Sequence, residues 1–197
     1  MNTTIKKILP AVLLMCSILM VGQTQFKTDK ASSLVNWKGS KPTGEHYGTV
    51  NLKSGHFTYQ DKKIVEGEFE IDMNSIINLD MPSDSESNAK LVKHLKSDDF
   101  FAASKYPVAI FKLSSTEPKG DKTLCKGNLT IKGITHPVSF LATITQDGQN
   151  LSLKSETFKI DRSKWNIKFK SKSFFSDLGD KFIYDDIELS VDVHAVN

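Results

Sequence analysis

Apolar and polar residues alternate along most of the chain from Ser33 onward, which is the period of a β-strand with one buried face. The clearest run covers residues 65–72, where Val65, Gly67, Phe69 and Ile71 alternate with acidic residues. Runs of the same kind cover residues 35–38, 50–53, 56–59, 109–113, 127–131, 138–144, 151–153 and 187–193. The pattern predicts eight or nine strands, each with one apolar and one polar face.

Turn residues separate several of these runs. Ser54-Gly55 predicts a turn between residues 50–53 and 56–59, and Lys119-Gly120-Asp121, Gly133 and Asp147-Gly148 lie at hairpin spacing. Short turns between consecutive strands favour an antiparallel meander. A sheet of this many strands tends to close on itself, which removes its exposed edges. We therefore expect an all-β, mainly antiparallel, eight-stranded barrel.

One segment has helical instead of alternating periodicity. In residues 87–95, Ala89, Leu91, Val92 and Leu95 recur at helical spacing, and Ser87 is a candidate N-cap. This predicts a short helix over one end of the barrel. A second irregular segment, residues 163–180, predicts a long loop or an irregular hairpin.

Residues 1–22 have the pattern of a secretory signal peptide. Two lysines lie in residues 1–7, and residues 8–22 are almost wholly apolar. This apolar run of about 15 residues is shorter than the roughly 20 that a membrane-spanning helix needs. We expect cleavage near residue 22 and one domain over residues 23–197. Cys16 raises lipidation as an alternative, which the bulky Met15 before it disfavours.

Charge and cysteine content narrow the function classes. The chain has a net charge of +3, which falls to about +1 without the two lysines of residues 1–22. A nearly neutral domain lacks the basic excess that attracts nucleic acid. Cys125 is the one cysteine of residues 23–197, so no disulfide forms within that domain, and its alternation with Gly127 and Leu129 predicts an inward-facing, inert thiol.

The sequence contains none of the common nucleophile, zinc, P-loop or dinucleotide motifs. Asp84, Glu86 and Asn88 imitate the start of a calcium loop, but Ala89 replaces the required Gly and Leu95 the bidentate acid. The histidines lie far apart in the sequence. We therefore expect no catalytic residue, no metal site and no cofactor.

Two apolar features leave alternatives open. Arg162 and four lysines interleave with aromatic residues between 162 and 175, which fits either an anionic membrane surface or an ordinary strand with a charged outer face. The inward aromatics either fill a solid core or line a cavity, because alternation alone cannot distinguish a packed barrel from a hollow one. These aromatics are Trp37, Phe57, Phe69, Phe111 and Phe140.

Several short segments together resemble the YceI-like family over residues 33–196, in matching order and spacing. The segments are Val35-Asn36-Trp37-Lys38-Gly39, His46-Tyr47-Gly48, Ser54-Gly55, Ile71-Asp72-Met73-Asn74-Ser75-Ile76, His94-Leu95-Lys96-Ser97-Asp98-Asp99-Phe100-Phe101, Tyr106-Pro107, the stretch from Gly127 to Val138, and Ile160-Asp161-Arg162. The resemblance implies a secreted, lipocalin-like barrel that binds polyisoprenoid or other long-chain lipids, and it suggests a periplasmic location.

On this interpretation an apolar cavity carries a long-chain isoprenoid or fatty lipid without covalent chemistry. We expect it to be lined by Trp37, Val50, Phe57, Phe69, Leu91, Leu95, Phe111, Phe140 and Leu189, with the helix closing one end. Arg162 either stabilises an anionic head group or pairs with a carboxylate. Phe174-Phe175 suggests a membrane contact or a homodimer. The alternatives are an enzyme that uses His46, His56 or Cys125 in the same cavity, and a solid-core stress or interaction module.

Overall fold

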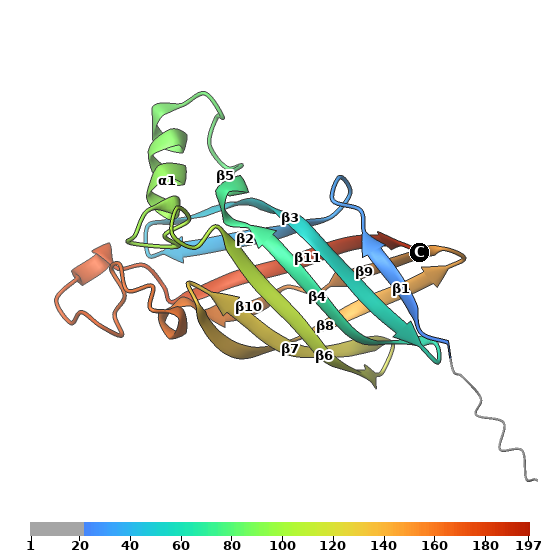
Figure 1. Ribbon diagram of the computed structural model, residues 1–197. Coiled ribbons are helices and arrows are strands. Elements are labelled where there is room, and N and C mark those ends of the chain that lie inside the picture. The colour runs from blue at the N-terminus through green and yellow to red at the C-terminus, as the bar shows by residue number, and fades with distance from the viewer. Residues whose placement is uncertain (1–21) are drawn as a thin grey trace, which may run out of the picture.

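The structure is a computed structural model that describes residues 22–197 (Figure 1). Its strands form one antiparallel sheet, and eight of them close a ring because the last, β11, pairs with both β9 and β2. Around the ring these strands are β2 (Leu34–Lys41), β3 (Gly44–Gln60), β4 (Lys63–Asp72), β6 (Val108–Lys119), β7 (Lys122–Ile131), β8 (Ile134–Asp147), β9 (Asn150–Ser155) and β11 (Asp186–Val196). This barrel-like arrangement confirms the expected fold class.

Three further strands lie off the ring. They are β1 (Thr24–Thr28), which pairs with β3 and β11, β5 (Ile77–Asn78), which pairs with β3, and β10 (Phe158–Asp161), which pairs with β11. Each has at most five residues, too few for alternation to stand out in the sequence.

The prediction of a turn at Ser54-Gly55 is wrong, because β3 runs through this point as one strand of 17 residues. The register with β4 instead shifts between Leu52 and Ser54, as at a β-bulge. A Cβ atom on Gly55 would lie 2.5 Å from Cδ1 of Phe69. Glycine is therefore required here because an aromatic ring packs on the backbone, not because the chain reverses.

The two ends of the ring differ in their connections. At one end, which we call the hairpin end, short turns at residues 60–63, 119–122 and 147–150 join neighbouring strands. At the other, the loop end, residues 73–107 and 162–185 form long connections (Figure 1). The second of these connections, residues 162–185, contains the 3-10 turns η2 (Arg162–Trp165) and η3 (Gly179–Lys181). Residues 166–185 form no strand, so the irregular segment expected at residues 163–180 is a long loop.

The helix α1 (Glu86–Lys96) lies at the loop end. Its N-cap is Ser85, whose hydroxyl accepts a hydrogen bond from the backbone N–H of Asn88, so the expectation of Ser87 as cap is wrong. Figure 1 shows most of α1 projecting beyond the sheet. No helix within residues 22–197 combines the length and apolar character that crossing a membrane requires.

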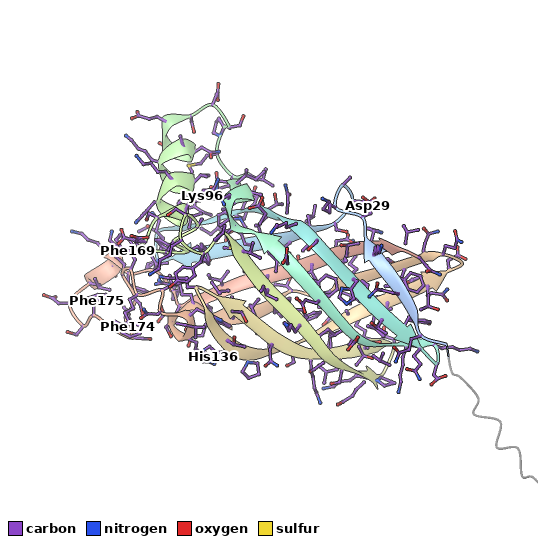
Figure 2. The ribbon with its side chains drawn as sticks, viewed as in Figure 1. Asp29, Lys96, His136, Phe169, Phe174 and Phe175 are labelled. Carbon is purple, nitrogen blue, oxygen red and sulfur yellow. The ribbon has the colours of Figure 1, made fainter. Side chains whose placement is uncertain are left out.

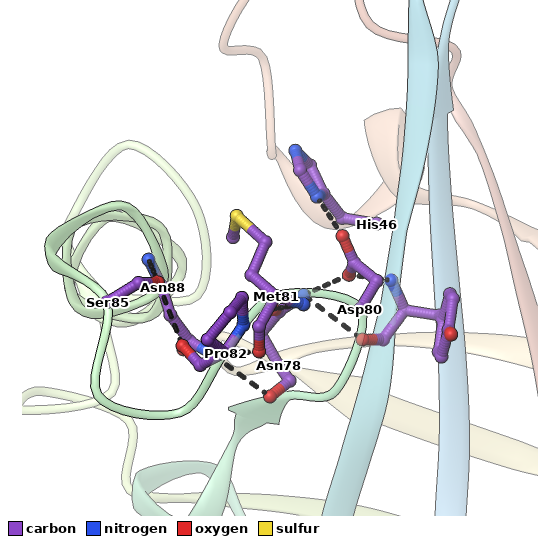
Figure 3. Close-up of polar contacts among 8 residues, drawn as sticks. His46, Asn78, Asp80, Met81, Pro82, Ser85 and Asn88 are labelled. Atoms are coloured by element: carbon purple, nitrogen blue, oxygen red, sulfur yellow. Dashed lines mark hydrogen bonds and ion pairs between the residues drawn. The ribbon is translucent and has the colours of Figure 1, made fainter.

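A polar network fixes the chain between β5 and α1 (Figure 3). The Asp80 carboxylate accepts hydrogen bonds from Nδ1 of His46 at 2.8 Å and from the N–H of Tyr47 at 2.9 Å, and Asn78 also contacts it. Although burial raises the pKa of Asp80, these hydrogen bonds outweigh it and hold the pKa below its ordinary value. The Asn88 amide donates to the carbonyls of Asn78 and Met81. Asn88 thus organises this loop.

Candidate functional site: an apolar cavity

The inward faces of the strands enclose a cavity of about 180 Å³. Because side chains alternate between the two faces of each strand, every strand of the ring sends apolar residues inward. Residues from the loop end complete the wall, among them Leu95, Phe100, Phe101, Ile183 and Tyr184. Arg162 is the one charged side chain on the cavity wall formed by residues 22–197. The cavity is therefore suited to a hydrocarbon guest.

The structure places most of the residues expected to line the cavity on its wall. These are Trp37, Val50, Phe57, Phe69, Leu95, Phe111, Phe140 and Leu189. Leu91 is different, because it packs against the hydrophobic core and is not part of the wall. Only the last apolar position of α1, Leu95, reaches the cavity, since most of the helix projects beyond the sheet (Figure 1).

Several inward-facing side chains remain only partly buried. Trp37, Phe111 and Leu189 lie on the wall and pack against the core, yet each keeps solvent-accessible surface. Protein interiors are normally packed as tightly as organic crystals, so inward apolar side chains in a solid core would be fully buried. The interior is hollow in this part of the ring.

The hairpin end is filled instead. The buried side chains of Phe26, Ile64, Cys125 and Leu151 belong to the core cluster but not to the cavity wall. Strand β1 covers this end by pairing with β3, where Phe26 lies opposite Phe57. The cavity is therefore closed at the hairpin end by ordinary core packing.

The cavity opens at the loop end, beside Tyr184. This residue lines the cavity and is 48% exposed. Gly39, on β2, also lines the cavity, and a Cβ atom added to it would meet nothing within 4 Å. A side chain at position 39 would thus extend into free space at the opening.

Arg162 is buried beside the cavity, where its guanidinium group holds the loop end together. Nε donates to the carbonyl of Tyr184 at 3.2 Å, Nη1 to that of Ile167 at 3.0 Å, and Nη2 to that of Ile183 at 3.1 Å. Nη2 also lies 3.1 Å from Oδ1 of Asp185, an ion pair without hydrogen-bond alignment. Burial lowers the pKa of Arg162, and Asp185 opposes this effect. Of the two roles expected for Arg162, pairing with a carboxylate or stabilising an anionic head group, the structure contains the first.

Asp185 extends the same network into the loop. Its Oδ2 accepts hydrogen bonds from the hydroxyls of Ser171, at 2.8 Å, and Ser173, at 2.7 Å. Ser171 is fully buried. Asp185 therefore links residues 171–173 to Arg162 at the base of the loop.

The indole N–H of Trp37 is the polar group on the wall that sequence reasoning missed. Its Nε1 is buried and has no hydrogen-bond partner within residues 22–197, whereas Nε1 of Trp165 donates to the carbonyl of Leu129 at 3.2 Å. A buried donor without a partner costs about 1 to 3 kcal/mol. A guest with a hydrogen-bond acceptor at this depth would remove that cost.

The three residues considered for an enzyme do not line the cavity. His46 pairs with Asp80, His56 lies opposite Glu68 on the β3–β4 ladder, and Cys125 is buried in the packed hairpin end. Burial raises the pKa of the Cys125 thiol to about 12, so the reactive thiolate does not form near neutral pH. These positions offer no convergent polar groups to a guest in the cavity.

A closed antiparallel sheet around an apolar cavity defines a hollow, barrel-like protein. The chain belongs to the YceI-like domain family, whose model matches residues 26–195. It is 30% identical over 147 residues to protein YceI of Escherichia coli O157:H7, covering 74% of this chain and 72% of the relative. A UPF0312 protein of Pseudomonas putida is 31% identical over 153 residues, covering 74% and 77% of the two chains.

Solved structures share the fold. BcnA of Burkholderia cenocepacia matches with a TM-score of 0.66 and 22% identity, covering 86% of this chain and 99% of that one. A polyisoprenoid binding domain from Saccharophagus degradans, implicated in plant cell wall breakdown, matches with a TM-score of 0.62 and 13% identity, covering 87% and 97% of the two chains. At these identities the likeness concerns the fold alone.

Proposed function

We propose that this protein binds a long-chain isoprenoid or a similar amphiphile in its cavity and carries or sequesters it without covalent chemistry. The observation that carries the proposal is a hollow, almost wholly apolar interior that is closed at the hairpin end and open at the loop end. The fold shared with a polyisoprenoid binding domain supports the same class of guest.

The size of the cavity limits how much of the guest is enclosed. One water molecule needs about 10 to 15 Å³ of volume in this measure, so about 180 Å³ corresponds to roughly 12 to 18 groups of that size. A methylene group is of similar size. The cavity therefore encloses three or so isoprene units, about 15 carbons, and a longer tail extends through the opening.

Binding strength follows from this enclosed length. Each buried methylene group contributes up to about 0.8 kcal/mol, so each isoprene unit strengthens binding until the cavity is full. Arg162 is committed to protein carbonyls and to Asp185, so an anionic head group is not its partner. Selectivity therefore depends on the shape of the tail and on an acceptor that meets Nε1 of Trp37.

The location of the protein is part of the same proposal. The signal peptide expected at residues 1–22, with Cys16 inside it, lies almost wholly outside the described residues, which begin at residue 22. We propose that the protein is exported, to the periplasm, where a lipid carrier would contact a membrane transiently. Fractionation of tagged protein tests this, and a cytoplasmic pool as the main product would contradict it.

The cavity itself is tested with a variant that fills its opening. Gly39→Leu places a side chain in the free space beside Tyr184. The control, Ser40→Leu, introduces leucine at the neighbouring position, on the other face of β2. The protein is purified in the form that the producing cell accumulates, delipidated and incubated with a prenyl alcohol, and occupancy is read by native mass spectrometry.

We expect the unmodified protein and Ser40→Leu to take up the prenyl alcohol. Gly39→Leu should weaken uptake by about tenfold or more, because it displaces at least two methylene groups of the guest. Absence of uptake by the unmodified protein, or equal uptake by Gly39→Leu, would contradict the proposal and favour an interaction module.

A further inference from the structure

The apolar side chains left on the surface gather at one end of the molecule. Of the seven exposed large hydrophobic residues in the described part of the chain, all but Val196 lie at or beside the loop end. They are Tyr47, Ile77, Leu79, Phe174, Phe175 and Tyr184. Phe174 and Phe175 are adjacent, 44% and 49% exposed, and lie at the outer side of this end (Figure 2).

The two phenylalanines are held outward by a defined scaffold. The backbone N–H groups of both Phe174 and Phe175 donate to the carbonyl of Ser171, at 3.2 and 3.0 Å. Ser171 is itself fully buried and bonded to Asp185. The segment is further tied to the barrel by the 2.8 Å bond from the N–H of Ile183 to the carbonyl of Lys170. Their exposure is therefore built into the fold.

Three lysines lie in the same loop as this phenylalanine pair, at positions 168, 170 and 172. Nζ of Lys168 lies 4.7 Å from the ring centre of Phe174, and Nζ of Lys172 lies 3.6 Å from that of Phe182. Lys168, Lys170 and Lys172 form no ion pair within residues 22–197. Between residues 163 and 184 there are five lysines and only two aspartates. A nearly neutral domain thus concentrates free positive charge beside its cavity opening.

We propose that residues 168–175, which we call the basic loop, dock the protein on the surface of an anionic lipid bilayer. Exposed phenylalanines insert into the boundary between head groups and acyl chains, and lysines bind anionic head groups, so the loop combines both means of attachment. This inference deepens the proposed carrier function and rests on it for the biological role of docking. Docking itself is measurable with an empty cavity.

The basic loop lies in the same connection as residues that line the cavity opening, so docking brings a bilayer close to the guest. The same connection continues into Ile183 and Tyr184, which line the cavity at its opening. A bilayer in contact with Phe174 and Phe175 therefore lies next to that opening. A prenyl tail passes between bilayer and cavity along this contact with little exposure to water.

The effect of each part of the loop follows from known membrane electrostatics. A lysine near an anionic surface strengthens binding by about fivefold, so removal of all three lysine charges should weaken it by about a hundredfold. Salt should weaken binding of the unmodified protein as well, because these contacts are exposed to solvent.

Co-sedimentation with vesicles that contain no prenyl lipid tests the inference. Vesicles of phosphatidylcholine alone are compared with vesicles that also contain phosphatidylglycerol, using protein in the form that the producing cell accumulates. The variants are Phe174→Ser with Phe175→Ser, and Lys168→Gln with Lys170→Gln and Lys172→Gln. Controls at or near the hairpin end are Val196→Ser, which removes one exposed apolar side chain, and Lys30→Gln with Lys63→Gln and Lys119→Gln, which removes the same number of exposed lysine charges as the loop variant.

We expect binding to the anionic vesicles only, a loss of about tenfold or more in both loop variants, and little change in the controls. Three results would overturn the inference. These are absence of binding to anionic vesicles, an equal loss in the hairpin-end controls, and a dimer in light scattering that dissociates on Phe174→Ser with Phe175→Ser. Native mass spectrometry of the same samples with prenyl alcohol reports cavity binding separately, so failure of docking and failure of the carrier function are distinguishable.

Discussion

Replacement of Arg162 by methionine would separate its structural role from any role in guest binding. The methionine keeps a long apolar stem beside the cavity but removes every donor of the guanidinium group. The carbonyls of Ile167, Ile183 and Tyr184 would then lose hydrogen bonds, and Asp185 would keep a charge without its partner. Arg162 is 1% exposed, so water cannot replace these contacts at the guanidinium position.

The expected cost is large because one partner of a buried ion pair is removed. Such changes destabilise proteins by about 3 to 5 kcal/mol, of which the unpaired carboxylate is a main part. For a domain of this size each kcal/mol lowers the melting temperature by about 2 to 4 °C, so we expect a decrease of roughly 6 to 20 °C. Arg162→Lys should lose less, since it keeps the charge but not the three-way fork of donors.

Chemical denaturation of Arg162→Met, Asp185→Asn and the double variant measures this directly. Asp185→Asn should recover part of the stability that Arg162→Met loses, because it removes the unpaired charge. If Arg162→Met instead costs less than about 1 kcal/mol and mainly abolishes binding of anionic amphiphiles, the structural argument is refuted and the head-group role is supported.

Three further predictions concern the guest and the loop that carries α1. Affinity for prenyl alcohols should rise with length up to about 15 to 20 carbons and then level off, and a steady rise to 40 carbons in titration calorimetry would contradict the cavity size. Trp37→Phe should weaken binding of an acceptor-bearing prenyl lipid by about fivefold or more relative to a plain hydrocarbon, as measured by competition, and an unchanged ratio would assign Nε1 no role. Asp80→Asn should cost about 1 to 3 kcal/mol at neutral pH. Folding lowers the pKa of Asp80, so its carboxylate stabilises the fold at pH values above its ordinary pKa, and this stabilisation is lost as the pH falls below about 4. A stability difference between Asp80→Asn and the unmodified protein that persisted at lower pH would argue against a role for the charge.

Alternation identified the strands of the ring, although it divided β3 into two runs, and it identified most of the residues that face inward. It could not show whether those residues touch one another across the interior, because the same pattern describes a packed barrel and a hollow one. The structure resolves this by position, since Phe26 and Leu151 fill the hairpin end while Trp37 and Phe111 remain partly uncovered.

Other features depend on contacts between residues far apart in the sequence. The glycine of Ser54-Gly55 is required by the ring of Phe69, which lies on another strand. The sequence does not show this contact, so Ser54-Gly55 was interpreted as a turn. The partners of Arg162 are mainly backbone carbonyls of an irregular loop, which no side-chain motif marks. The unpaired N–H of Trp37 is likewise a property of its surroundings, so the sequence offers no signal for it.

The division between a filled hairpin end and a hollow remainder separates two demands on the same sheet. Substitutions among the interlocked side chains at the filled end act on folding, whereas substitutions around Gly39 and Tyr184 act on what enters. Guest preference can therefore diverge between relatives through residues near the opening, while the stability of the barrel is conserved by residues that no guest reaches.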